Sequence, residues 1–383
     1  MRPLGSRSWL QAGKPASSHR LARVIGSLAL GVLATVGLAA LFGAAPIAAL
    51  AALTRGAVGS ADGLTESVLA AIPLLFTGLG VAVAFHCHLW NIGAEGQLLV
   101  GELAGVALAT HAARWPAAAL LPAVLGAGAL AGAGWAAIAA ALRVYRCVPE
   151  VISTIMLNFV ALYLVSWAVT GPLKEPGQDI PRTVLIPAAA RLPALGSRGL
   201  HSGLLLALLS AVVIGFLLIY TVPGFRIRAV GLGPEAAAAA GMPVRQTLML
   251  AFLVSGALAG LAGGVQLAGV TYRVYGGSSP GTGYTAIAVA LVGRLHPLGV
   301  LLAAFFFGAL MAGSNEMQRT AGVSSVIAYV IQAVALLALI AWPTFNPNPS
   351  GENAKARKRE GREPDRTDHH GNTETRRGAE GDS

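Results

Sequence analysis

The chain has 383 residues, of which 55% are hydrophobic and only 11% are charged. Soluble domains carry about 25% charged residues, so this composition excludes an ordinary soluble protein and indicates that lipid is the main solvent. The net charge of +10 does not indicate a nucleic-acid-binding protein, because the basic residues lie at the N-terminus and in short segments between apolar runs. That distribution is the positive-inside pattern of membrane proteins.

Residues 1–23 form a polar, basic N-terminus with five Lys or Arg residues and no acid. The apolar run that follows, 24–53, is longer than the core of a signal peptide, which has about 7–15 residues. We therefore predict an uncleaved first membrane helix with a cytoplasmic N-terminus. Cleavage at an Ala-rich site near Ala44 and Ala45 is the alternative.

Ten apolar runs approach the length of about 20 residues that a membrane-spanning helix needs. They predict an all-α fold, a polytopic transmembrane helical bundle of about ten spans within 24–342. The short runs are candidates for half-helices or broken helices; they are 97–111, 283–294 and 298–313. The other runs are 24–53, 67–85, 117–142, 151–170, 203–221, 247–270 and 324–342.

Alternation from a cytoplasmic N-terminus places 143–149 and 222–246 inside, and both segments contain Arg. It places the segment 171–202 outside although this segment contains basic residues, because long loops are translocated across the membrane largely regardless of their charge. The end of the chain, 343–383, is predicted to be a disordered cytoplasmic tail. From 351 onward it has eight basic and eight acidic residues and cannot bury a core.

Two further patterns concern helix packing. Cys87 and Cys147 are predicted to be small buried residues, because two isolated thiols make neither a disulfide framework nor a metal cluster. The GxxxG spacings Gly128/Gly132, Gly256/Gly260 and Gly260/Gly264 predict that helix backbones approach closely.

Polar residues concentrate at 86–102, where lipid is expected. If the segment from Asn91 is helical, Asn91, Glu95 and Glu102 share one face, and Gly93 and Gly96 make the helix easy to break. A broken helix in a membrane must lie against protein or a watery cavity. The segment is thus either a substrate path or hinge, or a short cytoplasmic connection between two spans.

A second polar stripe joins Glu150, Thr154 and Asn158. Glu150 follows Pro149 and suits the start of a helix, where an acid faces the positive end of the dipole. Asn158 lies deeper, so it must bond another helix or face a cavity.

The sequence lacks the residue patterns of a metal site, of an ATP-binding phosphate loop and of an enzyme active site. His86 and His88 belong to no metal-ligand spacing, so no metal and no cofactor is predicted. The chain has no GxxxxGK[ST] phosphate loop for ATP hydrolysis. Glu95 and Glu102 have no accompanying catalytic pattern that would indicate an enzyme.

The segment 226–243 predicts a short helix between two spans. Pro234 and Glu235 begin an Ala-rich stretch of high helix propensity, which Gly241 and Pro243 end. Glu235, Ala236, Ala237 and Gly241 match the EAAxxxG pattern, and here the chain resembles the permeases of ATP-binding-cassette (ABC) importers. Four other ordered stretches resemble the simple-sugar and nucleoside branch, which is related to ribose and branched-chain amino-acid permeases. They are 90–97, 149–158, 253–263 and 286–298, with Trp90 where that branch usually has Phe.

The resemblance implies a permease domain over 24–342 that translocates a nucleoside or simple sugar across the bacterial cytoplasmic membrane. It implies three partners besides the lipid bilayer: a cytoplasmic ATPase that docks on Glu235–Gly241, a second permease subunit, and an external substrate-binding lipoprotein. Asn91, Glu95, Gln97 and Asn158 are expected near the substrate path.

Two other functions compete with this interpretation. An ion-driven secondary transporter would need a paired acid and base in the membrane, and Glu95 and Glu102 have no obvious Lys or Arg partner. A membrane enzyme would need a set of reacting residues, which the sequence does not provide.

Overall fold

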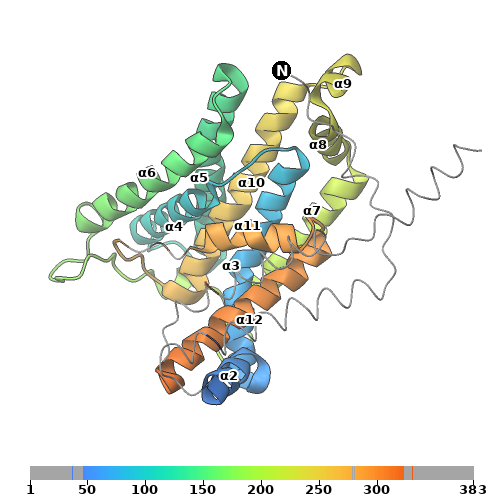
Figure 1. The fold of residues 1–383 in the computed structure, drawn as a ribbon. Helices are drawn as coiled ribbons and strands as arrows, with labels where there is room; N and C mark the ends of the chain where they lie inside the picture. Colours follow the sequence, from blue (N-terminus) through green and yellow to red (C-terminus); the bar gives the residue numbers. More distant parts are fainter. Residues whose placement is uncertain (1–36, 38–45, 278, 280, 323–329, 331–383) are drawn as a thin grey trace, which may run out of the picture. The chain divides into compact units, whose positions relative to one another are not determined.

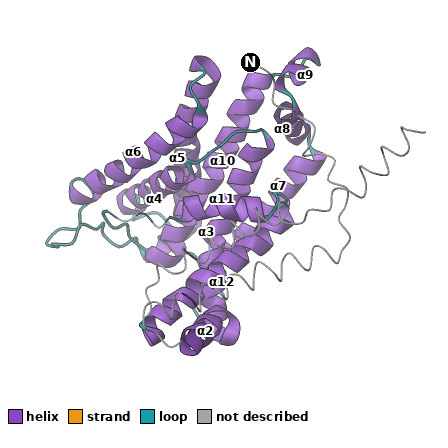
Figure 2. Ribbon diagram, in the orientation of Figure 1, coloured by secondary structure: helices purple, strands orange, loops and turns teal. Residues whose placement is uncertain are grey.

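The computed structural model of the chain describes residues 37, 46–277, 279, 281–322 and 330, which form helices joined by loops (Figures 1 and 2). Within these residues no extended strand is present, and the three β-bridges are isolated pairs, such as Lys174 with Thr183. The predicted all-α fold is confirmed. The predicted N-terminus 1–23 and tail 343–383 lie outside the described residues.

The described elements follow one another along the chain with short connections, apart from the long loop 171–202. They are α2 (Pro46–Thr54), η1 (Arg55–Gly59), α3 (Ala61–His86), α4 (Ala94–His111), α5 (Ala117–Arg146), α6 (Glu150–Thr170), η2 (Ala188–Ala190), α7 (Gly203–Tyr220), α8 (Val222–Leu232), α9 (Pro234–Ala239), α10 (Val244–Gln266), η3 (Leu267–Thr271), α11 (Thr282–Val292) and α12 (Pro297–Ala321).

Six of the described helices are long and apolar enough to cross a bilayer: α3, α5, α6, α7, α10 together with η3, and α12. A polytopic membrane bundle is thereby confirmed. The predicted spans 24–53 and 324–342 fall mainly outside the described residues, although α2 covers the end of the first. The count of ten remains a prediction.

The three short runs have different outcomes. The run at 283–294 forms α11, whose 11 residues extend about 16 Å, half of a hydrocarbon core about 30 Å thick. The run at 97–111 forms α4, which has 18 residues and is not among the six spans. A half-helix at 298–313 is wrong, because α12 has 25 residues and continues to Ala321. Arg319 in its last turn pairs with Glu66 of α3 and with Glu316, which compensates these charges at the helix end.

The glycines of α5 and α10 bring the two backbones into direct contact. A Cβ at Gly132 would overlap the carbonyl oxygen of Gly256, and a Cβ at Gly260 would overlap that of Gly128. The predicted pairs Gly128/Gly132 and Gly256/Gly260 therefore lie at one interface, where the close backbone approach is confirmed. Small residues serve this purpose in membranes, where dispersion forces between helices replace the hydrophobic effect.

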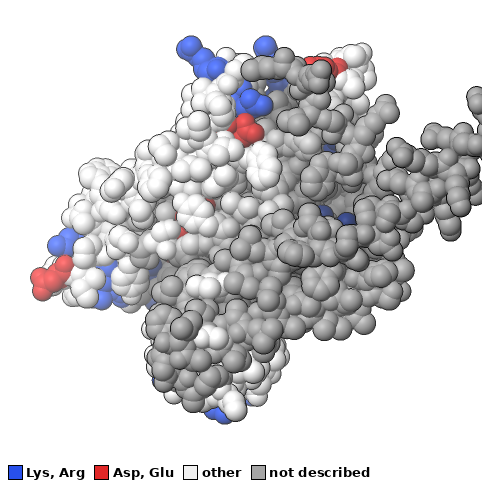
Figure 3. Space-filling model, viewed as in Figure 1, with Lys and Arg blue, Asp and Glu red and all other residues white. Residues whose placement is uncertain are grey.

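Chain segments predicted to share a side of the membrane lie at the same end of the structure. The α5–α6 connection and α8–α9 are at the upper end in Figure 1, and the loop 171–202 is at the lower left. On the face in Figure 3, charged side chains lie mainly at these ends, and the surface over α6 between them is mostly uncharged. Exposed apolar side chains cover that surface: Ile152, Met156, Phe159, Val160, Tyr163 and Trp167.

The two cysteines are free and differ in their environment. Cys87 is buried as predicted, and burial raises the pKa of its thiol to about 12, so the thiol stays protonated. The prediction that Cys147 is buried is wrong. α5 ends at Arg146, and Cys147 lies exposed in the connection that follows, with a left-handed backbone.

Candidate functional site

The connection between α3 and α4 is folded around the side chain of Asn91. Its Oδ1 accepts hydrogen bonds from the Gly93 N–H (3.1 Å) and from Gln97 Nε2 (3.0 Å). Its Nδ2 donates to Gln97 Oε1 (3.0 Å) and to Ser255 Oγ of α10 (2.8 Å). Both amides are fully buried, and because each hydrogen-bonding atom has a partner, burial carries no penalty of unsatisfied groups.

Asn91 lies in the connection before the helix, because α4 starts at Ala94. The condition for a face shared by Asn91, Glu95 and Glu102, a helix that begins at Asn91, is therefore not met. The reason is local: an Asn side chain that bonds the N–H two residues on stabilises a turn in place of a helix. Glu95 and Glu102 are both within α4, and Glu102 accepts a hydrogen bond from Thr271 Oγ1 (3.2 Å).

Asn158 connects α6 to this region from the side. It lies eight residues after the start of α6, about 12 Å along the axis. Its Oδ1 accepts from the N–H of Gly96 (2.8 Å), one of the unpaired donors in the first turn of α4. Its Nδ2 donates to the Ile92 carbonyl (2.9 Å) and to Tyr284 Oη of α11 (3.2 Å). Three helices are thus joined by one amide.

Glu95 occupies the place where α4 and α11 begin. Its carboxylate accepts hydrogen bonds from Ser279 Oγ (2.5 Å), the Gly281 N–H (2.9 Å) and the Gly283 N–H (2.6 Å). Gly283 has no room for a Cβ, which would overlap the backbone of Glu95. The carboxylate is buried between two positive helix ends, which stabilise an anion there.

The structure therefore brings Asn91, Glu95, Gln97 and Asn158 together in one buried polar network. Sequence reasoning missed three residues that complete it: Ser255 of α10, Tyr284 of α11, and Ser279 in the segment before α11. A lone Ser in the apolar stretch 253–263 was a usable indication for Ser255. Among the ion pairs of the described residues, none involves Glu95 or Glu102.

Glu150 begins a helix, as its position after Pro149 predicted. It is the first residue of α6, and its carboxylate pairs with Arg143 Nε at 3.1 Å. Thr154 bonds the Glu150 carbonyl (2.7 Å). Only Asn158 of the predicted stripe reaches the network.

The segment with the EAAxxxG pattern forms the predicted short helix, α9. Pro234 is its first residue, and Glu235 and Ala236 are exposed, whereas Ala237 is buried. Gly241 ends it with φ of +77°, a left-handed conformation that glycine adopts without strain. A cavity of about 550 Å³ lies between α8 and α9, and it is lined mainly by apolar groups that include Phe225, Leu232 and Ala236.

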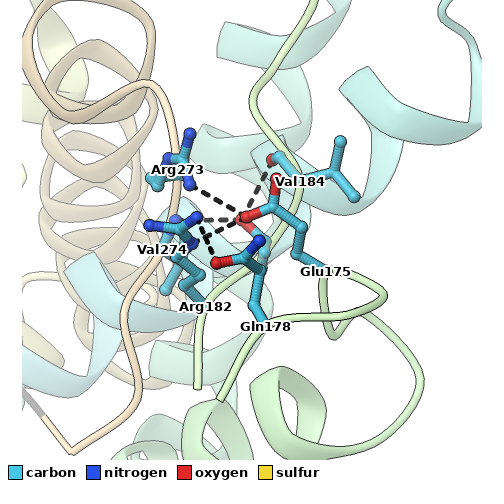
Figure 4. A network of polar contacts seen from close by, with 7 residues as sticks. Glu175, Gln178, Arg182, Val184, Arg273 and Val274 are labelled. Atoms are coloured by element: carbon cyan, nitrogen blue, oxygen red, sulfur yellow. Dashed lines mark hydrogen bonds and ion pairs between the residues drawn. The ribbon is translucent and has the colours of Figure 1, made fainter. Parts of the chain in front are cut away.

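At the opposite end, an ion-pair network joins the loop 171–202 to the segment before α11 (Figure 4). Glu175 Oε2 accepts from Arg182 Nε (2.7 Å) and from Arg273 Nη1 (3.0 Å). Arg182 also donates to Gln178 Oε1 (2.8 Å). Arg182 is one of the basic residues that conflicted with an external position of this loop. Its charge is compensated by Glu175 of the same loop, a pairing that the sequence alone did not show.

Comparisons with known proteins complete this description. Residues 63–340 match the family described as "Branched-chain amino acid transport system / permease component". The chain is 36% identical to the glucose ABC transporter permease protein of Haloferax volcanii, over 87% of this chain and 88% of the relative.

Two other relatives match this chain over a similar share of its length. The guanosine ABC transporter permease protein of Bacillus subtilis is 37% identical, over 84% of this chain and 92% of the relative. The nucleoside ABC transporter permease protein of Lactococcus lactis is 33% identical, over 77% and 84%. No solved structure matches the chain significantly.

Proposed function

Since this chain belongs to the branched-chain amino-acid transport permease family and is a membrane permease subunit of an ABC importer, we propose that it carries a neutral nucleoside or simple sugar. The names of its relatives support both substrate classes. The buried Glu95 carboxylate is the observation that supports a neutral substrate. It is specific to this chain and does not depend on the names of the relatives.

The argument from Glu95 concerns the two helix N-termini that meet in the protein. Such a site attracts anions, because its N–H groups and dipoles point at one place. In transporters with broken helices it can bind an anionic group of the substrate. Here the Glu95 carboxylate already accepts the N–H groups of Gly281 and Gly283. These donors are therefore not available to a carboxylate or phosphate of a substrate, and the Glu95 carboxylate beside them would repel such a group.

We propose that Asn91, Glu95, Gln97 and Asn158 hold the wall of the substrate path. All four are buried. Asn158 and Glu95 connect the start of α4 to α11, whereas Asn91 and Gln97 connect the α3–α4 segment to α10. The side chains that reach the surface beside them are Trp90 and Tyr284, which are 51% and 43% exposed. Both are aromatic groups of the kind that pack against bases and sugar rings.

We propose a partner for each of the two ends of the structure. The exposed face of α9, from Glu235 to Gly241, with the apolar cavity beside α8, would receive the cytoplasmic ATPase, which hydrolyses ATP for this subunit. The loop 171–202 would face the external binding lipoprotein, and a second permease subunit would complete the path. In this arrangement both termini are cytoplasmic, and the chain lies in the cytoplasmic membrane of a bacterium.

Uptake measurements test the proposal. Cells or proteoliposomes with the complete transporter are given labelled guanosine, glucose or guanosine monophosphate, with and without this chain. We expect ATP-dependent uptake of guanosine or glucose that requires the chain, and no uptake of the monophosphate. Uptake of neither neutral solute, or equal uptake of the phosphate, would contradict the substrate class.

A further inference from the structure

The segment His86-Cys87-His88 has no role in the function proposed above. His86 is the last residue of α3 and is half-buried. Its Nε2 lies 3.1 Å from the carbonyl oxygen of Leu295, which is 209 positions further along the chain. In the tautomer with the hydrogen on Nε2, the imidazole donates to this carbonyl. The end of α3 is thus bonded to the connection between α11 and α12.

That connection has an unusual backbone. Arg294 and Leu295 have φ values of +53° and +59°, in the left-handed region that non-glycine residues rarely adopt. Two successive residues in this region are sterically unfavourable and need support from their surroundings. The hydrogen bond from His86 holds the carbonyl of Leu295 and supplies part of this support.

The backbone of His86 also contacts the segment that precedes α9. Gly231 is buried near the end of α8, and a Cβ there would overlap the carbonyl oxygen of His86. Figure 1 shows α8 beside the upper end of α3. Because this is a contact between two backbones, a displacement of α8 displaces His86 directly.

At its other end, α11 is held by Glu95, through the N–H groups of Gly281 and Gly283. α11 is a short, regular helix, so it moves as one piece. Contacts therefore run without interruption from Gly231 to His86, from His86 to Leu295, and along α11 to Glu95.

We propose that His86 is a positioning residue that transmits movement of α8 and α9 to α11, and through α11 to the network around Glu95. The inference rests on the proposed function, in which the ATPase docks on α8 and α9. His88 has no such role: it is exposed, and none of the described hydrogen bonds involves its side chain.

The test uses the complete transporter in proteoliposomes, with guanosine and glucose as probes and with uptake and ATP hydrolysis measured together. His86→Asn shortens the side chain so that its amide cannot reach Leu295, whereas His86→Gln places an amide nitrogen near the position of Nε2. His88→Asn is the matched control, and Asn tolerates its positive φ. Copurification of the ATPase shows whether each variant assembles.

We expect His86→Asn to assemble normally but to lower uptake per ATP hydrolysed about tenfold. We expect His86→Gln to restore most of the ratio, and His88→Asn to match the wild type. An unchanged ratio in His86→Asn overturns the inference, and so does an equal defect in His86→Gln or loss of the ATPase from His86→Asn. Absence of uptake by the wild type contradicts instead the proposed function.

Discussion

The carboxylate of Glu95 lies 2.6 Å from the backbone nitrogen of Gly283, and this bond joins the first turns of α4 and α11. The two residues are 188 positions apart in the chain. A side chain at the start of α4 thus satisfies unpaired N–H groups at the start of α11. Removal of the Glu95 carboxylate leaves these buried donors without their acceptor, which has consequences for stability.

We predict that Glu95→Gln destabilises the protein by about 1–3 kcal/mol, the cost of leaving buried donors without an acceptor. The amide keeps one acceptor oxygen, but its NH₂ group faces an N–H of Gly281 or Gly283. Thermal unfolding in detergent measures the change. Glu66→Gln is the control, because its pair with Arg319 is exposed and pairs of that kind contribute about 0–1 kcal/mol. Equal melting temperatures for the two variants would refute this role of Glu95.

The α5–α10 contact gives a prediction with a control two residues away. Gly132→Ala places a methyl group onto the carbonyl oxygen of Gly256, and we expect a loss of about 1–3 kcal/mol from overpacking. Gly134 is exposed, and a Cβ there meets no atom within 4 Å. Gly134→Ala should leave stability unchanged or raise it by up to about 1 kcal/mol, since Ala favours helix. Unfolding temperatures of the two variants test this, and we expect Gly132→Ala to unfold at the lower temperature. A lower unfolding temperature for Gly134→Ala would contradict the contact between Gly132 and Gly256.

Gly241 permits a test of the α9 end. Its φ of +77° suits Gly and is tolerated by Asn, whereas a β-branched residue there is strained. We expect Gly241→Val to weaken copurification with the ATPase and to lower ATP-dependent uptake at least tenfold, without affecting membrane insertion. Gly241→Asn should keep both the copurification of the ATPase and the ATP-dependent uptake. If Val and Asn behave alike, the conformation of this turn is not what the ATPase requires.

The Glu175–Arg273 pair is predicted to be stronger than an ordinary surface pair. Its side chains are 23% and 12% exposed, and hydrogen bonds between charged groups contribute about 1.5–3 kcal/mol when partly buried. A double-mutant cycle with Glu175→Gln and Arg273→Gln should give a coupling energy of about 1–2 kcal/mol.

The same cycle on Asp62 and Arg198 provides the comparison. Their atoms are 3.5 Å apart, and their side chains are 86% and 61% exposed. We expect a coupling energy near zero there, because solvent and salt screen the pair. Equal coupling energies in the two cycles would show that the Glu175 network is only a surface feature.

Sequence reasoning succeeded where the cause is local. Pro234 and Gly241 bound α9 because proline suits the first helical position and glycine the left-handed end. The GxxxG glycines predicted a tight interface, although the sequence could not say that α5 packs on α10. Asn158 was expected to need a partner because an amide is costly in lipid, and that argument held.

Where the cause is distant, the sequence was less informative. The donors to Glu95 come from a segment 184 to 188 positions away, and no periodicity predicts that pairing. For Asn91 the sequence left a helix and a connection open, because spacing alone does not show the turn that its side chain stabilises. α12 continues beyond the apolar run 298–313 to Ala321, through Glu316 and Arg319. Their charges are compensated by ion pairs, and the partner Glu66 lies far away in the sequence.

The glycine interface has a consequence for how the protein can move. Where carbonyl oxygens of α5 touch the α-carbons of α10, neither helix can rotate or slide past the other without a steric clash. We therefore expect these two helices to keep their relative position in the transport function proposed above. A change of access from one side of the membrane to the other would then arise around them, in parts whose contacts are made by side chains.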